Sequence, residues 1–109
     1  MLFTYGQGQF IEGNTAIKGE LALNEHKLFL RDTNGEDLTR TYVPLDKVHL
    51  IRKKDGESFE VSIRLTLAYQ STVLFRGDSK RIDELIRDIV QHRGFKKKFL
   101  KNEWYGEIV

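Results

Sequence analysis

The sequence predicts a small, mainly β domain closed by one α-helix near its C-terminus. Two observations predict it: short segments with β-strand patterns fill most of the chain, and one amphipathic segment follows at residues 79–93. In that segment apolar residues recur three and four positions apart, which places them on one stripe of a helix: Ile82, Leu85, Ile86, Ile89 and Val90. A stripe of this width suits an apolar surface, so we expect the helix to cap a β-barrel or sandwich.

Both ends of the helix carry the residues that helices prefer there. Asp78 or Ser79 can accept a hydrogen bond from a first-turn N–H group, and Gly94 suits the left-handed position that follows a last turn. We expect Leu85 and Ile89 to be among the most buried residues of the helix. The helix is therefore predicted to be an integral part of the fold.

Turn residues divide the rest of the chain into about seven strands. Asn24-Glu25-His26 predicts a tight hairpin, Asn34-Gly35 and Asp55-Gly56 predict turns, and Pro44 is expected to close a strand. The predicted strands are residues 9–11, 17–23, 27–31, 39–43, 48–53, 59–67 and 71–76.

The strand over residues 59–67 has the clearest alternation. One set of its side chains is apolar and is expected to face the core: Phe59, Val61, Ile63, Leu65 and Leu67. The other set is expected to face water and includes Glu60, Ser62 and Arg64. A slip of one residue would exchange the two sets.

Length predicts one domain, and the absence of Cys is compatible with a reducing compartment. A chain of 109 residues can bury one core, and the absence of Cys excludes disulfides, thiolate-bound zinc and a thiol nucleophile. Residues 1–8 lack the basic start of a signal peptide, and no apolar run approaches the roughly 18 residues of a membrane span. We expect a cytoplasmic protein.

No catalytic or metal-binding pattern appears in the sequence. His26, His49 and His92 fall in a predicted loop, a strand and a helix end, at spacings that do not suggest a metal site. Gly6-Gln7-Gly8 has no predicted strand before it or helix after it, so it is not expected to bind phosphate. We therefore expect a protein that is not an enzyme and that has no metal, cofactor or small-molecule substrate.

The charge is unevenly distributed, although the net charge is only +2. Residues 1–50 hold five Lys or Arg against seven Asp or Glu, whereas residues 51–109 hold thirteen against nine. We divide the chain into a domain at 1–94 and a basic, aromatic tail at 95–109 that packs on the domain or extends it. The candidate contact residues for a partner or an anionic surface are Arg93, Phe95, Lys96, Lys97, Lys98, Phe99, Lys101 and Trp104.

Two stretches of sequence resemble GRAM and bacterial pleckstrin-homology-like domains. Residues 19–30, Gly-Glu-Leu-Ala-Leu-Asn-Glu-His-Lys-Leu-Phe-Leu, look like the opening hairpin of that family, and residues 42–48 look like its next element. The resemblance covers about residues 17–93. It implies a pleckstrin-homology-like, orthogonal β-barrel of about seven strands, capped by the helix at 79–93. A more distant resemblance is to the first half of an archaeal chemotaxis adaptor family.

The resemblance implies a binding function but does not identify the partner. Phosphoinositide-binding members carry Lys and Arg in the loop after their first strand. The corresponding loop here, residues 12–16 or 24–26, has no basic cluster. We therefore expect an adaptor that binds a protein or associates with itself as a homo-oligomer.

Two alternatives stay open. In the first, the tail binds an anionic membrane surface without headgroup specificity, and the protein is a peripheral membrane protein. In the second and weaker one, a small β-barrel binds nucleic acid. OB-fold barrels usually place their helix between strands three and four, whereas here it follows the predicted strands.

Overall fold

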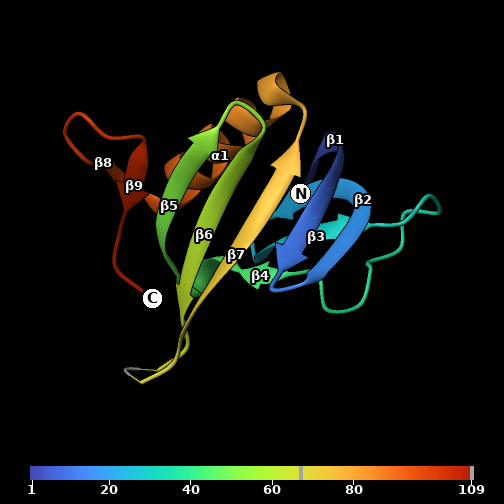
Figure 1. The fold of residues 1–109 in the computed structure, drawn as a ribbon, viewed down its shortest axis with the longest axis horizontal. Helices are drawn as coiled ribbons and strands as arrows, with labels where there is room; N and C mark the ends of the chain where they lie inside the picture. Colours follow the sequence, from blue (N-terminus) through green and yellow to red (C-terminus); the bar gives the residue numbers. More distant parts are fainter. Residues whose placement is uncertain (67, 109) are drawn as a thin grey trace.

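One open antiparallel sheet and one α-helix make up the fold in the computed structural model, which describes residues 1–66 and 68–108. Within these residues the elements are β1 (Leu2–Glu12), β2 (Thr15–Asn24), β3 (Lys27–Arg31), β4 (Val43–Pro44), the short 3₁₀ helix η1 (Leu45–Lys47), β5 (Val48–Asp55), β6 (Ser58–Arg64), β7 (Gln70–Gly77), α1 (Ser79–Arg93), β8 (Lys96–Lys97) and β9 (Glu103–Tyr105). The order across the sheet is β4-β3-β2-β1-β7-β6-β5-β9-β8 (Figure 1).

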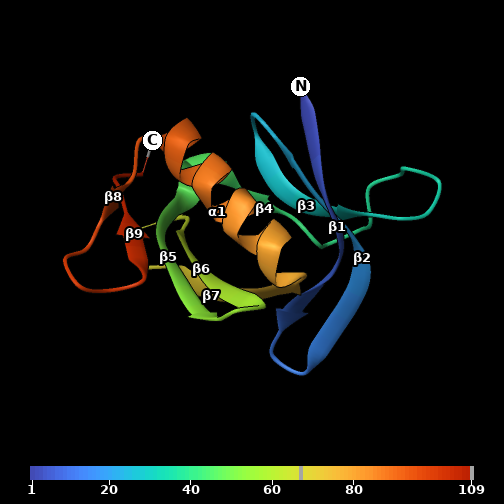
Figure 2. The same ribbon diagram turned by 90° about the horizontal axis from the view of Figure 1, so that it is seen from above.

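The sheet bends around α1. Figure 2 shows the helix on the inner side of the sheet, between the half formed by β5 to β7 and the half formed by β1 to β3. Ile82, Leu85, Ile86 and Ile89 are buried there, as predicted, and Val90 packs against the same core. The helix is thus an integral part of the fold.

The predicted ends of the helix are confirmed. The Asp78 carboxylate accepts hydrogen bonds from the backbone N–H groups of Lys80 and Arg81, at 3.1 and 3.4 Å. Gly94 follows the last turn in the left-handed conformation, with φ of 66°. The chain therefore reverses direction directly after α1.

Three aromatic rings form the centre of the core across neighbouring strands. Phe75 on β7 lies opposite Phe10 on β1 and Phe59 on β6. Its ring meets that of Phe10 edge-on at 5.4 Å and stacks on that of Phe59 at 5.6 Å. Val61 and Val73 are also buried, so the inward faces predicted for these two strands are confirmed at these positions.

Strand β1 begins earlier than predicted. Its first half includes Gly6-Gln7-Gly8, where the pairing with β2 shifts register and Gly6 has φ of 78°. A side chain at Gly8 would meet the Arg76 carbonyl oxygen at 2.4 Å. These glycines therefore permit a bulge and a close crossing of strands, an arrangement that apolar alternation does not reveal.

Two further strand predictions need correction. Residues 39–43 do not form a strand, because Arg40 has a left-handed backbone, with φ of 62°, and only Val43 and Pro44 pair with β3. Strand β6 ends at Arg64, and Leu65, which was expected in the core, is 48% exposed beyond the paired region. The prediction for Leu67 lies outside the described residues.

The strand count and the position of the helix also differ from expectation. The described residues form nine strands in an open sheet, where about seven strands in a barrel were predicted. The helix is not the last element, because β8 and β9 follow it and pair onto the edge of β5. The two late strands have two and three residues and were missed because they are too short for periodicity to detect.

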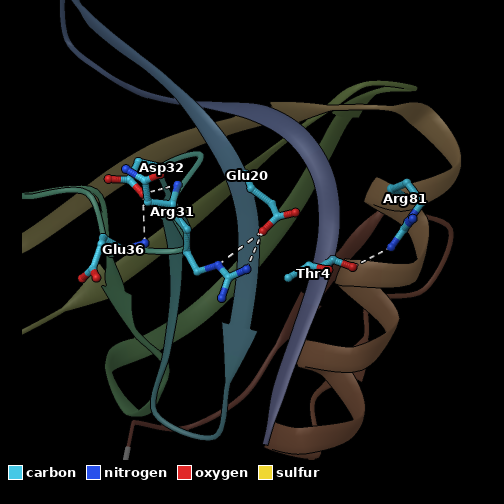
Figure 3. A network of polar contacts seen from close by, with 7 residues as sticks. Thr4, Glu20, Arg31, Asp32, Glu36 and Arg81 are labelled. Carbon is cyan, nitrogen blue, oxygen red and sulfur yellow. Dashed lines mark hydrogen bonds and ion pairs between the residues drawn. The ribbon is translucent and has the colours of Figure 1, made fainter.

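Polar contacts tie the first strands together and to the helix (Figure 3). Arg31 on β3 donates to the Glu20 carboxylate on β2 at 2.8 Å. Arg81 on α1 donates to the Thr4 carbonyl oxygen on β1 at 2.5 Å. In the connection after β3, the Asp32 carboxylate accepts from the backbone N–H groups of Asn34 and Glu36. These contacts join β2 to β3, order the connection after β3, and tie β1 to α1.

Candidate interaction surface

Six of the eight candidate residues predicted from sequence lie in a hairpin at one edge of the sheet, and the other two, Arg93 and Phe95, come shortly before it. We call residues 96–105, which comprise β8, β9 and the turn between them, the C-terminal hairpin. Strand β9 pairs with β5 through Leu50↔Tyr105, Ile51↔Trp104 and Arg52↔Glu103, and β8 pairs with β9. Figure 2 shows the loop of the hairpin projecting at the edge of the molecule, on the side away from β1 to β3.

Three of the candidate residues hold this hairpin to the domain, and we call them the anchor: Arg93, Phe95 and Trp104. Phe95 is 7% exposed and belongs to the core, and Trp104 packs against the core from β9. Trp104 also lines a shallow hollow on α1, together with Ile86 and Val90.

The guanidinium of Arg93 is occupied by backbone groups. It donates to the carbonyl oxygens of Leu45 and Val48, the latter at 2.9 Å, and to that of Glu107 at 2.5 Å. It also lies over the ring of Phe95, 4.9 Å from the ring centre. Burial lowers the pKa of Arg93, and the nearby charge of Asp46 opposes that shift. Arg93 therefore joins the end of α1 to η1, to the start of β5 and to the segment that follows β9.

The turn of the hairpin, Lys98–Lys101, holds its most exposed apolar side chains, and we call it the tip. The backbone N–H of Lys101 donates to the carbonyl oxygen of Lys98 at 3.3 Å, which makes Phe99 and Leu100 the two central residues of a β-turn. Their side chains are 88% and 85% exposed. The tip therefore presents two consecutive large apolar side chains to solvent.

Leu100 has a backbone conformation that leucine seldom adopts. Its φ is 60°, in the left-handed region, where a Cβ atom meets neighbouring backbone and where Gly is the usual residue. Leu100 was not among the residues selected from sequence. The missing signal was its place in a turn, which periodicity does not reveal because the flanking strands are so short.

The charges around the tip are mostly positive. Lys98 pairs with Glu103 at 3.3 Å, and Arg52 pairs with the same carboxylate at 3.1 Å. Burial acts to raise the pKa of Glu103, but the hydrogen bonds and charges of Lys98 and Arg52 outweigh it and hold that pKa below its usual range. Lys96, Lys97 and Lys101 are exposed, and none has an ion-pair partner among the described residues.

The histidines do not form a metal site within residues 1–66 and 68–108. No group of three or more His, Cys, Asp or Glu side chains there is arranged to hold a metal ion. His92 contacts the carbonyl oxygen of Glu25 at 3.1 Å, whereas His49 lies on β5 with its Nε2 atom buried and without a hydrogen-bond partner. Burial, and next the charge of Arg64, lower the pKa of His49.

A second hollow lies where the start of β1 meets α1. Its lining includes Met1, Phe3, Leu23 and His92, and its volume is about 360 Å³. Beside it, the Tyr5 hydroxyl donates to the Asp88 carboxylate at 2.6 Å. Burial, and next that hydrogen bond, raise the pKa of Tyr5 well above its usual range. The Tyr5 hydroxyl and the Asp88 carboxylate are thus paired with each other beside the hollow.

Comparison with known proteins identifies the fold. No protein-family model matches the sequence, and no curated protein matches it. The structure is similar to a chain in the crystal structure of human RhoA in complex with the DH/PH fragment of PDZRhoGEF, with a TM-score of 0.60 and 17% sequence identity. The match covers 82% of this chain and 28% of that chain.

A likeness at this level of identity shows the fold alone. The predicted pleckstrin-homology-like fold is thus supported, in the form of a mainly β structure with one helix and an open antiparallel sheet. No helix in the described residues is both long enough and apolar enough to span a bilayer.

Proposed function

We propose that this chain is a non-enzymatic binding module that holds its partner through the tip of the C-terminal hairpin. The observation that carries the proposal is the near-complete exposure of Phe99 and Leu100, side by side in one turn. Exposed apolar residues scattered singly are ordinary on protein surfaces. Two adjacent ones on a protruding turn, surrounded by lysines, favour a contact element.

The backbone of Leu100 supports the same conclusion. A left-handed residue costs roughly 1 kcal/mol unless it is Gly, and an 85% exposed side chain recovers little of that by packing within the domain. Packing of the Leu100 side chain within the domain therefore does not offset the cost of its backbone conformation. A contact of this side chain with another molecule explains better why leucine is present at the position.

The fold is compatible with an adaptor role. The solved structure to which this chain is similar contains a DH/PH fragment in complex with RhoA, and that association is a property of those proteins. For this chain, a protein partner, a second copy and an anionic membrane surface would all use the same tip. The GRAM-like relationship, the domain boundary at residue 94 and the cytoplasmic location stay predictions.

A nucleic-acid partner is less favoured by the tip. Lysines on the hairpin would attract phosphates, and Phe99 could stack on an exposed base. Leu100 has no flat ring on which a base could stack. A partner with an apolar contact area fits the pair better.

Site-specific photo-cross-linking tests the proposal without assuming the class of partner. Benzoylphenylalanine replaces Phe99 in one protein and Tyr42 in a control, because Tyr42 is an aromatic residue that is also 57% exposed, outside the hairpin. Each protein is irradiated in a cell extract that retains its membranes. Position 99 should give several-fold more adducts, whether with protein, lipid or a second copy, than position 42. Equal yields, or no adduct at position 99, would contradict the proposed function.

A further inference from the structure

We infer that the partner of the tip is an anionic lipid bilayer, into which Phe99 and Leu100 insert while the hairpin lysines contact the headgroups. The inference rests on the proposed function and names its partner. It differs from binding of one inositol phosphate in a pocket, because the turn between β1 and β2, at Gly13 and Asn14, carries no cation. The argument depends on the shape, the charge and the backbone of the tip.

The shape of the tip suits a deformable apolar medium. Phe99 and Leu100 are the central residues of the turn, and Lys98 and Lys101 are its first and last residues. The two apolar side chains therefore lie at the end of the hairpin and are almost fully exposed, with a lysine on either side in sequence. Long lysine side chains can keep their ammonium groups at headgroup level while their carbon chains follow the apolar residues inward.

The charge of the hairpin favours an anionic membrane. Four lysines lie at residues 96, 97, 98 and 101, and the one acidic side chain, Glu103, is already paired with Lys98 and Arg52. Each lysine near an anionic surface strengthens binding by about fivefold, at roughly 1 kcal/mol per cation. The lysines without an ion pair therefore give a clear preference for acidic over neutral lipid.

The backbone of the tip limits how deep it can enter. Hydrogen bonds of the turn occupy some of its N–H and carbonyl groups, and the remaining ones need water or headgroups. Only the two apolar side chains can therefore pass below the headgroups. The anchor stays outside, because Phe95 and Trp104 remain packed on the domain.

This geometry predicts a reversible attachment that depends on surface charge. Two apolar side chains and a few cations give binding that weakens strongly as salt rises, since screening at about 0.15 M limits attraction to roughly 8 Å. Acidic lipids should act through their charge alone. Phosphatidylserine and an inositol phospholipid should therefore bind the chain equally well at matched surface charge.

The test uses the full chain and vesicles of phosphatidylcholine with or without phosphatidylserine. A variant with Phe99→Trp and Trp104→Phe has its one Trp at the tip, and a matched control combines Tyr42→Trp with Trp104→Phe. Thermal melts first establish that both variants are folded. With acidic vesicles at low salt, the tip variant should show a blue-shifted emission that brominated lipids quench, whereas the control should show neither change.

Variants of the tip separate insertion from simple attraction. Leu100→Gly and Phe99→Ser should each reduce binding to acidic vesicles about tenfold, because each removes an apolar side chain from the membrane. Changing Lys96, Lys97 and Lys101 to Gln should reduce binding by about a hundredfold, the product of three fivefold effects. The matched substitution Tyr42→Ser should leave binding unchanged.

Three results would overturn the inference. The first is no preference for acidic vesicles. The second is binding that Leu100→Gly and Phe99→Ser leave unchanged, which would mean attraction without insertion. The third is a strong protein or self adduct at position 99 together with no vesicle binding, which would leave the proposed function standing with a different partner. Absence of every adduct at position 99 would instead remove the proposed function itself.

Discussion

The anchor and the tip belong to one short segment of chain, yet their side chains have opposite surroundings. Phe95 and Trp104 pack on the domain, and Arg93 spans three backbone carbonyl groups. A few residues away, Phe99 and Leu100 contact mainly water. Both regions are basic and aromatic in sequence, so composition alone does not distinguish them.

Under the proposed function, one segment combines folding and binding. Pairing of β9 with β5 fixes the direction of the hairpin, and the anchor holds it against α1. The tip is then presented at a fixed place, with little of its apolar surface packed on the domain. Substitutions in the anchor should therefore lower stability, whereas substitutions in the tip should affect binding.

The reference for a fully packed position is Leu85 on α1. Leu85→Ala should lower the free energy of unfolding by about 2–5 kcal/mol, because it leaves a cavity between the helix and the sheet. Urea denaturation measures the change. A loss below about half a kcal/mol would mean that α1 is not packed on the sheet. Leu85→Ala could then no longer serve as the reference for the stability changes in the anchor and the tip.

The anchor is tested by Trp104→Ala. Because Trp104 is only partly buried, the expected loss is smaller, about 1–3 kcal/mol. The conservative change Trp104→Phe should recover much of it. Equal stability of the parent and the Ala variant would show that β9 does not hold the hairpin, and the distinction between anchor and tip would fail.

The pH dependence of stability tests β5, the strand that pairs with the hairpin. Burial lowers the pKa of His49 on β5 below its usual value of 6.5, so the unfolded chain takes up a proton before the folded one. The contribution of neutral His49 to the free energy of unfolding is therefore fully present above about pH 6.5. It is lost as the pH falls through the pKa of His49 in the folded state. His49→Gln should reduce the loss of unfolding free energy on the acid side of the pH profile. The change should be smaller than the loss of unfolding free energy caused by Trp104→Ala. An unchanged profile would show that His49 protonates freely in the folded protein.

The helix and most strands could be predicted from sequence because their signals are local. The stripe on α1, the Asp78 cap and the alternation from Phe59 to Ile63 all reflect burial on one face. The early start of β1 was missed because Gly6 and Gly8 serve a bulge and a close crossing, and both depend on the neighbouring strands.

The arrangement of the candidate residues could be predicted only in part for a similar reason. Charge and aromatic content selected the segment that forms the hairpin, but they did not separate anchor from tip. That separation depends on β9 pairing with β5, a contact between residues about fifty positions apart. Leu100 was missed because its left-handed backbone is a property of the turn, and nothing in its neighbours' composition reveals it.

The most direct test of the account is the free energy of unfolding of Leu100→Gly, measured by urea denaturation beside the parent. Glycine relieves a left-handed strain of about 1 kcal/mol, and the greater freedom of the unfolded chain offsets it by about 0.4–1 kcal/mol. The account therefore predicts a stability equal to that of the parent or slightly higher. A loss of more than about 1 kcal/mol would show that the Leu100 side chain serves the fold, and it would contradict the assignment of the tip to binding.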